Sequence, residues 1–203
     1  MKRLRRSFFN RDTNIVAREL LGKKIVRVFD DGPSAQGGLK KIEAVITETE
    51  AYHGFDDKAS HASRKKTERN KVMFEKPGLV YVYLIYGMHH CLNFVTMKKD
   101  FPAAVLIRSV RISNPTDPNH PTNPNNSIIN GPGRVCKALG IDRSFYGEDL
   151  TTSKKIWIES VETCHACPPN GRGMSNNFTA SKRIGVDYAE ECKDWEWNYK
   201  LNP

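Results

Sequence analysis

The run of residues 79–86, Leu-Val-Tyr-Val-Tyr-Leu-Ile-Tyr, is the feature that most restricts the fold of this chain. β-Branched and aromatic residues fill it and Gly87 closes it, which is typical of a β-strand. Residues 24–29, 42–49 and 103–112 also have strand-like patterns. Strands therefore outnumber helices, without the strand–helix alternation that produces a parallel sheet. We predict an α+β fold built on a mainly antiparallel, curved sheet with surrounding helices.

Two short segments carry helix signals. Asp12 and Thr13 can cap a helix that Gly22 ends. Pro132 suits the first turn of a second helix, which Gly140 stops. We expect both helices to pack on the sheet through their apolar residues.

The remaining segments bear on the domain organisation. Residues 113–130 are rich in Asn and Pro and predict a long loop, and residues 168–177 predict a second irregular stretch. A chain of 203 residues can bury one sizeable core but not two ordinary enzyme domains. We therefore predict a single domain over residues 1–203.

The charge of the chain points to a polyanionic partner. The net charge is +9, and residues 1–27 hold nine basic and two acidic side chains. Residues 42–57 hold five acids and no base, whereas residues 58–71 hold six bases and one acid. An acidic site between basic flanks suits an enzyme that acts on nucleic acid. The alternative, weighed about equally on charge alone, is a solvated surface that keeps the protein soluble.

Other targeting and metal signals are weak. No stretch approaches the run of about 18 apolar residues that spans a bilayer, and the basic start of the chain lacks the apolar core of a secretion signal. Cys164 and Cys167 have the spacing of half a zinc site, and Cys192 is the one later cysteine. Zinc needs four ligands, so we expect reduced thiols and no metal, and leave zinc at this segment as the alternative.

Paired carboxylates supply the first chemical hypothesis. Glu48 and Glu50 stand at i and i+2, so both point to one face if the strand persists, with Cα atoms about 7 Å apart. One carboxylate of such a pair can act as a base on water. Tyr81 and Tyr83 likewise share one face of their strand. Taken separately, exposed acids at a sheet edge and core tyrosines with hydroxyls at the rim are the commoner explanations.

Taken together, these residues form an ordered series of motifs: Glu48-Thr49-Glu50-Ala51-Tyr52, Asp56-Asp57, Ala59-Ser60-His61, Arg69-Asn70, Met73-Phe74, Tyr81-Val82-Tyr83-Leu84-Ile85-Tyr86-Gly87-Met88, Cys91-Leu92-Asn93 and Ala104-Val105-Leu106-Ile107-Arg108. Residues 16–23, 131–134 and 183–186 extend the series. The series resembles the 3-methyladenine (alkyladenine) DNA glycosylase family over nearly the whole chain. The resemblance implies a base-excision repair enzyme that flips a damaged purine out of duplex DNA and hydrolyses its N-glycosidic bond.

The resemblance also implies a role for each matching residue. Glu50 matches the general base that deprotonates the attacking water, Arg108 matches an arginine that helps to hold this water, and the main-chain carbonyl of Ile184 is its third partner. The base-binding pocket is implied to consist of Tyr52, His61, Tyr83 and Asn93, with a main-chain hydrogen bond from His61 to the base and the bulk of Asn93 opposing the 2-amino group of guanine. Tyr86, at a protruding β-hairpin or strand end, matches the side chain that intercalates into the duplex, with Met88 beside it.

The implied substrates are 3-methyladenine and 7-methylguanine, with hypoxanthine and ethenoadenine as further candidates. Cation–π attraction to the tyrosines favours cationic alkylpurines. The expected enzyme is monofunctional, without lyase activity, cofactor or metal, and monomeric. It acts in the cytoplasm on the nucleoid of a bacterium, or in the nucleus of a eukaryote.

Some features depart from the family pattern. Loop 113–130 replaces a region that is longer and partly helical in many relatives, and Glu68 stands where a proline is commoner. Two other functions stay open at this point. One is a nucleic-acid-binding protein that has lost catalysis, which would have no need of Glu50. The other is an RNA-directed hydrolase or a formyltransferase-like module, which would have no need of Tyr86.

Overall fold

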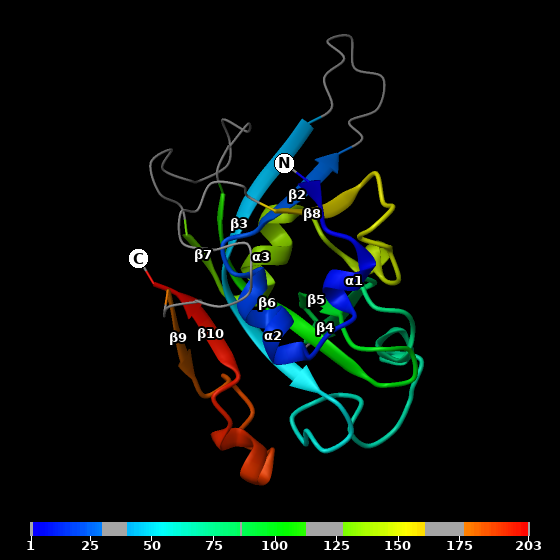
Figure 1. The fold of residues 1–203 in the computed structure, drawn as a ribbon, viewed down its shortest axis with the longest axis vertical. Helices are drawn as coiled ribbons and strands as arrows, with labels where there is room; N and C mark the ends of the chain where they lie inside the picture. Colours follow the sequence, from blue (N-terminus) through cyan, green and yellow to red (C-terminus); the bar gives the residue numbers. More distant parts are fainter. Residues whose placement is uncertain (1, 30–39, 86, 113–127, 161–176, 203) are drawn as a thin grey trace.

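The computed structural model describes residues 2–29, 40–85, 87–112, 128–160 and 177–202. Figure 1 shows one large sheet crossed by short helices. The strands are β1 (Lys2–Arg3), β2 (Lys24–Phe29), β3 (Lys40–His53), β4 (Val80–Ile85), β5 (His89–Val95), β6 (Ala103–Ile112), β7 (Ile128–Asn130), β8 (Ile156–Ser160), β9 (Phe178–Ser181) and β10 (Asn198–Leu201). The α-helices are α1 (Arg6–Phe9), α2 (Thr13–Leu20) and α3 (Pro132–Leu139), and 3₁₀ turns cover Lys71–Phe74, Arg143–Phe145 and Glu190–Asp194. The predicted α+β class is confirmed.

Strand β3 is the centre of the sheet. The strand order is β1-β8-β2-β3-β6-β5-β4, and all described pairs are antiparallel. The first half of β3 pairs with β2, its second half pairs with the late strand β10, and β6 runs along its other edge. As a result, residues from both ends of the chain meet at the second half of β3.

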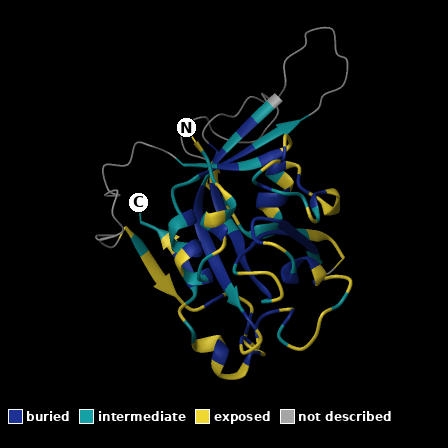
Figure 2. Cartoon of the chain, turned by 45° about the vertical axis from the view of Figure 1, so that its right-hand side comes forward, coloured by how far each residue is buried: buried dark blue, intermediate teal, exposed yellow. Residues whose placement is uncertain are grey.

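The two faces of the sheet have different partners. One face packs on α2 and α3 through Val16, Leu20, Val135 and Leu139, and forms the main core. The opposite face carries a smaller cluster that includes Tyr81, Tyr83 and Leu106. Figure 2 shows the buried residues concentrated in the central strands, whereas β9 is largely exposed. No α-helix of the described residues contributes to this second cluster, although the 3₁₀ turn Lys71–Phe74 does, and we call this side of the sheet the helix-free face.

In both β3 and β6, the alternation of residues that face the helices shifts by one residue, and the two shifts lie side by side. In β3, Ile42, Ala44 and Ile46 face the helices, but beyond the irregularity at Thr47 and Glu48 it is Ala51 that does so. Thr49 is on that side too, because its hydroxyl donates to the Ala17 carbonyl of α2 at 2.9 Å. In β6 the helix-facing residues change correspondingly: they are Val105 and Ile107 before the irregularity, and Val110 and Ile112 after it. Such an irregularity redirects side chains, and here it places Glu48, Glu50 and Arg108 on the helix-free face.

The helix ends follow the sequence signals. The Asp12 carboxylate accepts from the Asn14 and Ile15 main-chain N–H groups at 2.9 and 3.2 Å, which caps α2. Gly140 ends α3 in a left-handed conformation with φ 57°, which glycine adopts at little cost. Both predicted helices are thus confirmed.

Several strand predictions are confirmed and two need correction. Residues 24–29 and 103–112 are strands with the predicted bounds, and the strand predicted at 42–49 is longer. The predicted loop 113–130 is wrong at its end, because Ile128–Asn130 forms β7 on the edge of β6. The residues of strand β5 were not assigned to a strand, and β5 pairs with β4 in a hairpin. Residues 113–127 and most of the irregular stretch 168–177 lie outside the described residues.

Candidate active site

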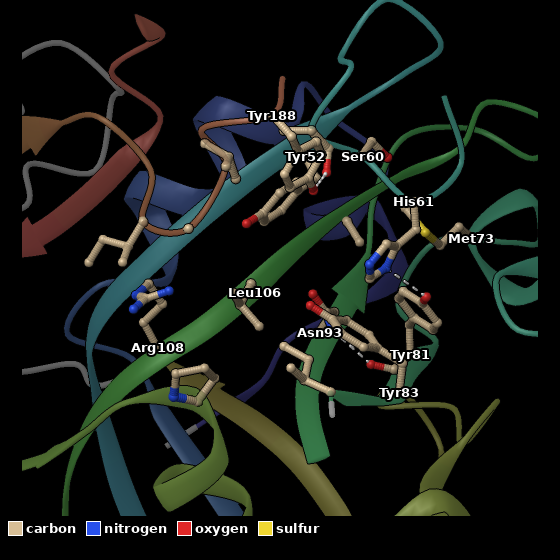
Figure 3. A pocket seen from close by; sticks show the side chains of 17 residues that line it. Tyr52, Ser60, His61, Met73, Tyr81, Tyr83, Asn93, Leu106, Arg108 and Tyr188 are labelled. Atoms are coloured by element: carbon tan, nitrogen blue, oxygen red, sulfur yellow. Dashed lines mark hydrogen bonds between the residues drawn. The ribbon is translucent and has the colours of Figure 1, made fainter. Parts of the chain in front are cut away.

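A cavity of about 120 Å³ lies on the helix-free face of the sheet. Strands β3 to β6 contribute Tyr52, Tyr81, Tyr83, Asn93, Leu106 and Arg108 to its wall. The loop after β3 adds Ser60 and His61, and the segment after β9 adds residues 184–186 and Tyr188. Figure 3 shows Tyr52 and Tyr188 on one side and Tyr81 and Tyr83 on the other. The cavity is therefore a slot between aromatic groups, as expected for a planar guest.

One wall of the cavity is a cluster of three rings. The His61 ring lies edge-on to Tyr83, with centroids 4.5 Å apart and an interplanar angle of 86°. Tyr81 lies 5.2 Å from Tyr83 and makes a 3.2 Å hydrogen bond to Nδ1 of His61. These contacts fix the orientation of each ring, so the wall is preorganised for stacking.

The cavity carries little charge from its aromatic walls. Burial, with a smaller contribution from Arg69, lowers the pKa of His61 to about 4, so the imidazole is neutral at neutral pH. Burial also raises the pKa values of Tyr52 and Tyr83 well above the usual range. Their hydroxyl groups therefore stay protonated and can donate hydrogen bonds.

Glu50 is fully buried beside this cavity and is held by four donors. Its Oε1 accepts from the Ile184 main-chain N–H at 2.8 Å and from Nδ2 of Asn198 at 3.1 Å. Its Oε2 accepts from the Tyr52 hydroxyl at 2.9 Å and from Nη1 of Arg108 at 3.4 Å. A carboxylate fixed in this way can take a proton from a correctly placed group without first reorganising.

Glu50 itself does not form part of the cavity wall. Tyr52 and Arg108 do, and both contact its Oε2. Arg108 also approaches Glu48, with 3.4 Å from its Nε to Oε1 of that residue. The single guanidinium is therefore shared between two carboxylates, and the predicted arrangement of Glu48 and Glu50 on one face is present.

A buried ion pair supports the segment that supplies Ile184. Arg183 and Asp57 have fully buried side chains and form two hydrogen bonds, of 2.6 Å from Nη1 and 2.8 Å from Nη2. Arg183 also donates to the Ala51 carbonyl at 2.9 Å and lies 4.9 Å from the centroid of the Tyr52 ring. This bidentate pair fixes residues 183–188 against β3.

The sequence analysis did not assign a role to Arg183, Asp57 or Asn198. Asp57 and Arg183 stand in the motifs quoted above, which is a signal that could have been used. Asn198 stands in no such motif. Its position depends on the pairing of β10 with β3, which local sequence does not reveal.

Asn93 lines the cavity through a fixed amide. Its Nδ2 donates to the Tyr81 and Cys91 carbonyls at 3.1 and 3.2 Å. These bonds occupy the nitrogen end of the amide and hold the side chain in the cavity wall between the tyrosine strand and β6. Asn93 therefore presents a fixed side chain to the cavity, and the role that the sequence analysis expected for its bulk stays a prediction.

A second groove borders the cavity on the hairpin side. It encloses about 800 Å³, and Ile85 and Pro132 line both spaces. His89, His90, Arg134 and Lys137 line the groove, and no Asp or Glu is among its described lining residues. A basic groove of this kind suits a phosphate backbone. Met88 lies at its edge and is 73% exposed.

Three predicted features are not tested by this geometry. Tyr86 lies outside the described residues, so its intercalation stays a prediction. Ile184 contacts Glu50 through its N–H group, whereas its predicted role involves its carbonyl. Cys164 and Cys167 also lie outside the described residues, and Cys192 is a buried free thiol.

Among residues 2–29, 40–85, 87–112, 128–160 and 177–202, no group of three or more His, Cys, Asp or Glu side chains is placed to hold a metal ion. No helix in the described part of the chain is long and apolar enough to cross a membrane.

Comparisons with known proteins cover almost the whole chain. Residues 7–203 match the sequence model of a family described as methylpurine-DNA glycosylase. A protein of Desulfitobacterium hafniense (strain Y51) is 41% identical over 99% of this chain and 96% of its own length. A protein of Clostridium novyi (strain NT) is 42% identical with the same coverage, and one of Methanocella arvoryzae is 41% identical over 98% and 94%. Each of the three is named "Putative 3-methyladenine DNA glycosylase".

Proposed function

The chain belongs to the methylpurine-DNA glycosylase family, and from this premise we propose that it hydrolyses the N-glycosidic bond of damaged purines in duplex DNA. The proposed substrates are alkylated purines, 3-methyladenine and 7-methylguanine, and the deaminated or bridged bases hypoxanthine and ethenoadenine. The observation that carries the proposal is the buried Glu50 carboxylate, which Tyr52 and Arg108 connect to an aromatic cavity.

The proposed reaction uses Glu50 as a general base. A water oxygen attacks C1′ of the deoxyribose, and Glu50 takes a proton from this water. The bond between C1′ and the purine nitrogen breaks, and its electron pair leaves with the base. The products are the free base and an abasic site. No amine attacks C1′ in this route, so we propose a monofunctional enzyme without lyase activity.

The hydrogen bonds of Glu50 indicate where the water binds. All four accepting positions of the carboxylate are engaged, and the contact from Arg108, at 3.4 Å, is the longest. A water is expected to insert between Oε2 and Arg108, because replacing this long hydrogen bond costs less stabilisation than replacing any of the three shorter ones. Arg108 then donates to the water and orients its lone pair, and the Ile184 carbonyl is the proposed third partner.

The aromatic cavity supports selection of the flipped base. Tyr52 on one side and Tyr83 with His61 on the other would stack on its two faces. Flipping costs a few kcal/mol and is easiest for damaged or mispaired bases. An N-alkylated cationic purine leaves as a neutral molecule, whereas a neutral purine must gain a proton as it leaves. We assign no acid for that proton.

The DNA is proposed to lie over the groove beside the cavity. Arg134 and Lys137 would contact phosphates, while Met88 and Tyr86 would enter the duplex where the base has left. One cavity accommodates one base, so we propose that the enzyme acts as a monomer and requires no cofactor.

The test is release of 3-methyladenine from alkylated duplex DNA under single-turnover conditions, with EDTA present. We expect release by the native protein, and a loss of about 10²–10⁴-fold in Glu50→Gln with binding to lesion duplex retained. Thr49→Val is the matched control, because Thr49 neighbours Glu50 but faces α2. Full activity of Glu50→Gln would refute the role of Glu50. Tight binding to lesion duplex without any release by the native protein would instead favour a binder that has lost catalysis.

A further inference from the structure

Glu48 and Asn198 lie next to Glu50 but have no part in the reaction described so far. Glu48 is nearly fully buried, at 5% exposure, and Asn198 at 3%. The Nδ2 of Asn198 donates to Oε1 of Glu48 at 2.9 Å and to Oε1 of Glu50 at 3.1 Å. One amide nitrogen therefore bridges two buried carboxylates, using both of its hydrogens.

The two carboxylates have one guanidinium between them. Arg108 lies 3.4 Å from an oxygen of each, through Nε on Glu48 and Nη1 on Glu50. Both distances exceed those of a close charge-assisted hydrogen bond, and Nε of Arg108 is buried without a hydrogen-bond partner in the described structure. Arg108 is thus held between the two acids and makes a close pair with neither.

The other groups that face Glu50 do not alter this balance of charge. Tyr52 on β3 and Tyr83 on β4 stay protonated, since burial raises the pKa of each. Arg183, behind Tyr52, is paired with Asp57. Asn198 on β10 is uncharged. Glu48 and Arg108 are therefore the ionic groups that remain to influence Glu50.

We propose that Glu48 and Asn198 are positioning residues for the general base, and the proposal rests on the function assigned to Glu50 above. Glu48 holds Arg108 away from Glu50, which leaves Oε2 accessible to the attacking water. Its negative charge also lies next to that of Glu50, and like charges repel each other at short range. Asn198 offsets this repulsion with a hydrogen bond to each carboxylate and so holds the two side by side.

The proposal predicts opposite effects for two variants. In Glu48→Gln, the repelling charge is absent and Arg108 can close on Glu50. The acid limb of the pH–rate profile is then expected to move to lower pH by about one unit, with a lower rate at the plateau. In Asn198→Leu, the shielding donor is absent. The acid limb is then expected to move to higher pH by a similar amount.

The measurement is single-turnover base release from one lesion duplex between pH 5 and 9. Every variant uses the same duplex, so ionisation of the lesion itself cancels in the comparison. Thr49→Val is again the control, because it loses a buried hydrogen bond on the opposite face of β3. The acid limb of the pH–rate profile of Thr49→Val is expected to coincide with that of the native protein. If Asn198→Leu does not fold, Asn198→Ser removes the amide bridge without adding apolar volume.

The outcomes separate the two levels of the proposal. If the native protein releases no base, the proposed function fails, and if Glu50→Gln matches the native protein, the role of Glu50 as the general base fails. In both cases the positioning roles fail as well. If Glu50→Gln is inactive but the limbs of the Glu48 and Asn198 variants stay in place, or move in the same direction, only the positioning roles are refuted. A merely structural role would lower the amount of active protein and leave both limbs unmoved.

Discussion

The substitution Asp57→Asn tests how much the support of the site contributes to stability. Asp57 accepts two hydrogen bonds from Arg183 and two from the His53 and Ala59 main-chain N–H groups, the last two at 3.1 Å. Asparagine keeps the shape but removes the negative charge, and its NH₂ group would face donors. Since both side chains of the ion pair are fully buried, we expect a loss of about 3–5 kcal/mol in the free energy of unfolding.

This loss corresponds to a decrease of roughly 6–20 °C in Tm for a domain of this size. Thermal unfolding followed by circular dichroism, with base release at 20 °C alongside, measures both effects. Lys182→Ala is the control, because Lys182 lies next to Arg183 but forms an exposed pair with Asp194 at 2.7 Å. A Tm of Asp57→Asn within 2 °C of the control, far short of that estimate, would mean that the buried pair does not stabilise the fold as we argue.

Three further predictions concern the cavity. Tyr52→Phe keeps the aromatic wall but removes the 2.9 Å hydrogen bond to Glu50, so single-turnover release is expected to fall about 10–100-fold at unchanged binding; an unchanged rate contradicts this. The folded environment lowers the pKa of His61 to about 4 from a usual value near 6.5. The stability linked to His61 is therefore complete above pH 6.5 and is lost as the pH falls towards 4; urea denaturation across this range is expected to show a shallower loss for His61→Gln, and parallel curves would refute it. The Arg69 guanidinium lies 5.1 Å from the Tyr83 centroid and lines a separate groove outside the cavity. Its positive charge opposes a cationic base at the same ring, so Arg69→Gln is expected to raise the release of cationic over neutral bases about two- to fivefold. A single duplex carrying both lesions measures this ratio, and phosphate contacts cancel in it.

Much of the fold could be predicted because its signals are local. Residues 24–29 and 103–112 are rich in β-branched residues, and both became strands within their predicted bounds. Asp12 and Gly140 marked the helix ends through capping chemistry that needs only neighbouring residues. Residues 128–130 were missed, since a three-residue edge strand depends on the partner that β6 offers.

The site was predictable only in part, for a similar reason. Tyr52, His61, Tyr83, Asn93 and Arg108 do line one cavity. Their recognition relied on motifs whose residues are close in sequence. Asn198 and Glu48, by contrast, stand 150 positions apart and meet only because β10 pairs with β3. The bidentate contact of Arg183 with Asp57 likewise spans 126 positions. Pairings of this kind arise from topology, which residue types alone do not specify.

Strands β3 and β6 each carry one extra residue at the irregularity between them, so the length of one strand depends on the length of the other. Removing Thr47 alone would restore simple alternation along β3 with Glu50 still on the cavity side, but β6 would keep its own extra residue, so Glu50 would no longer lie opposite Leu106. A compensating deletion in β6 at Ser109 would be needed to keep Arg108 and Leu106 in register with it. Substitutions at these two positions are therefore open to ordinary selection on size and polarity, but insertions and deletions must occur as a matched pair. Deletion scanning of both strands would map this constraint directly.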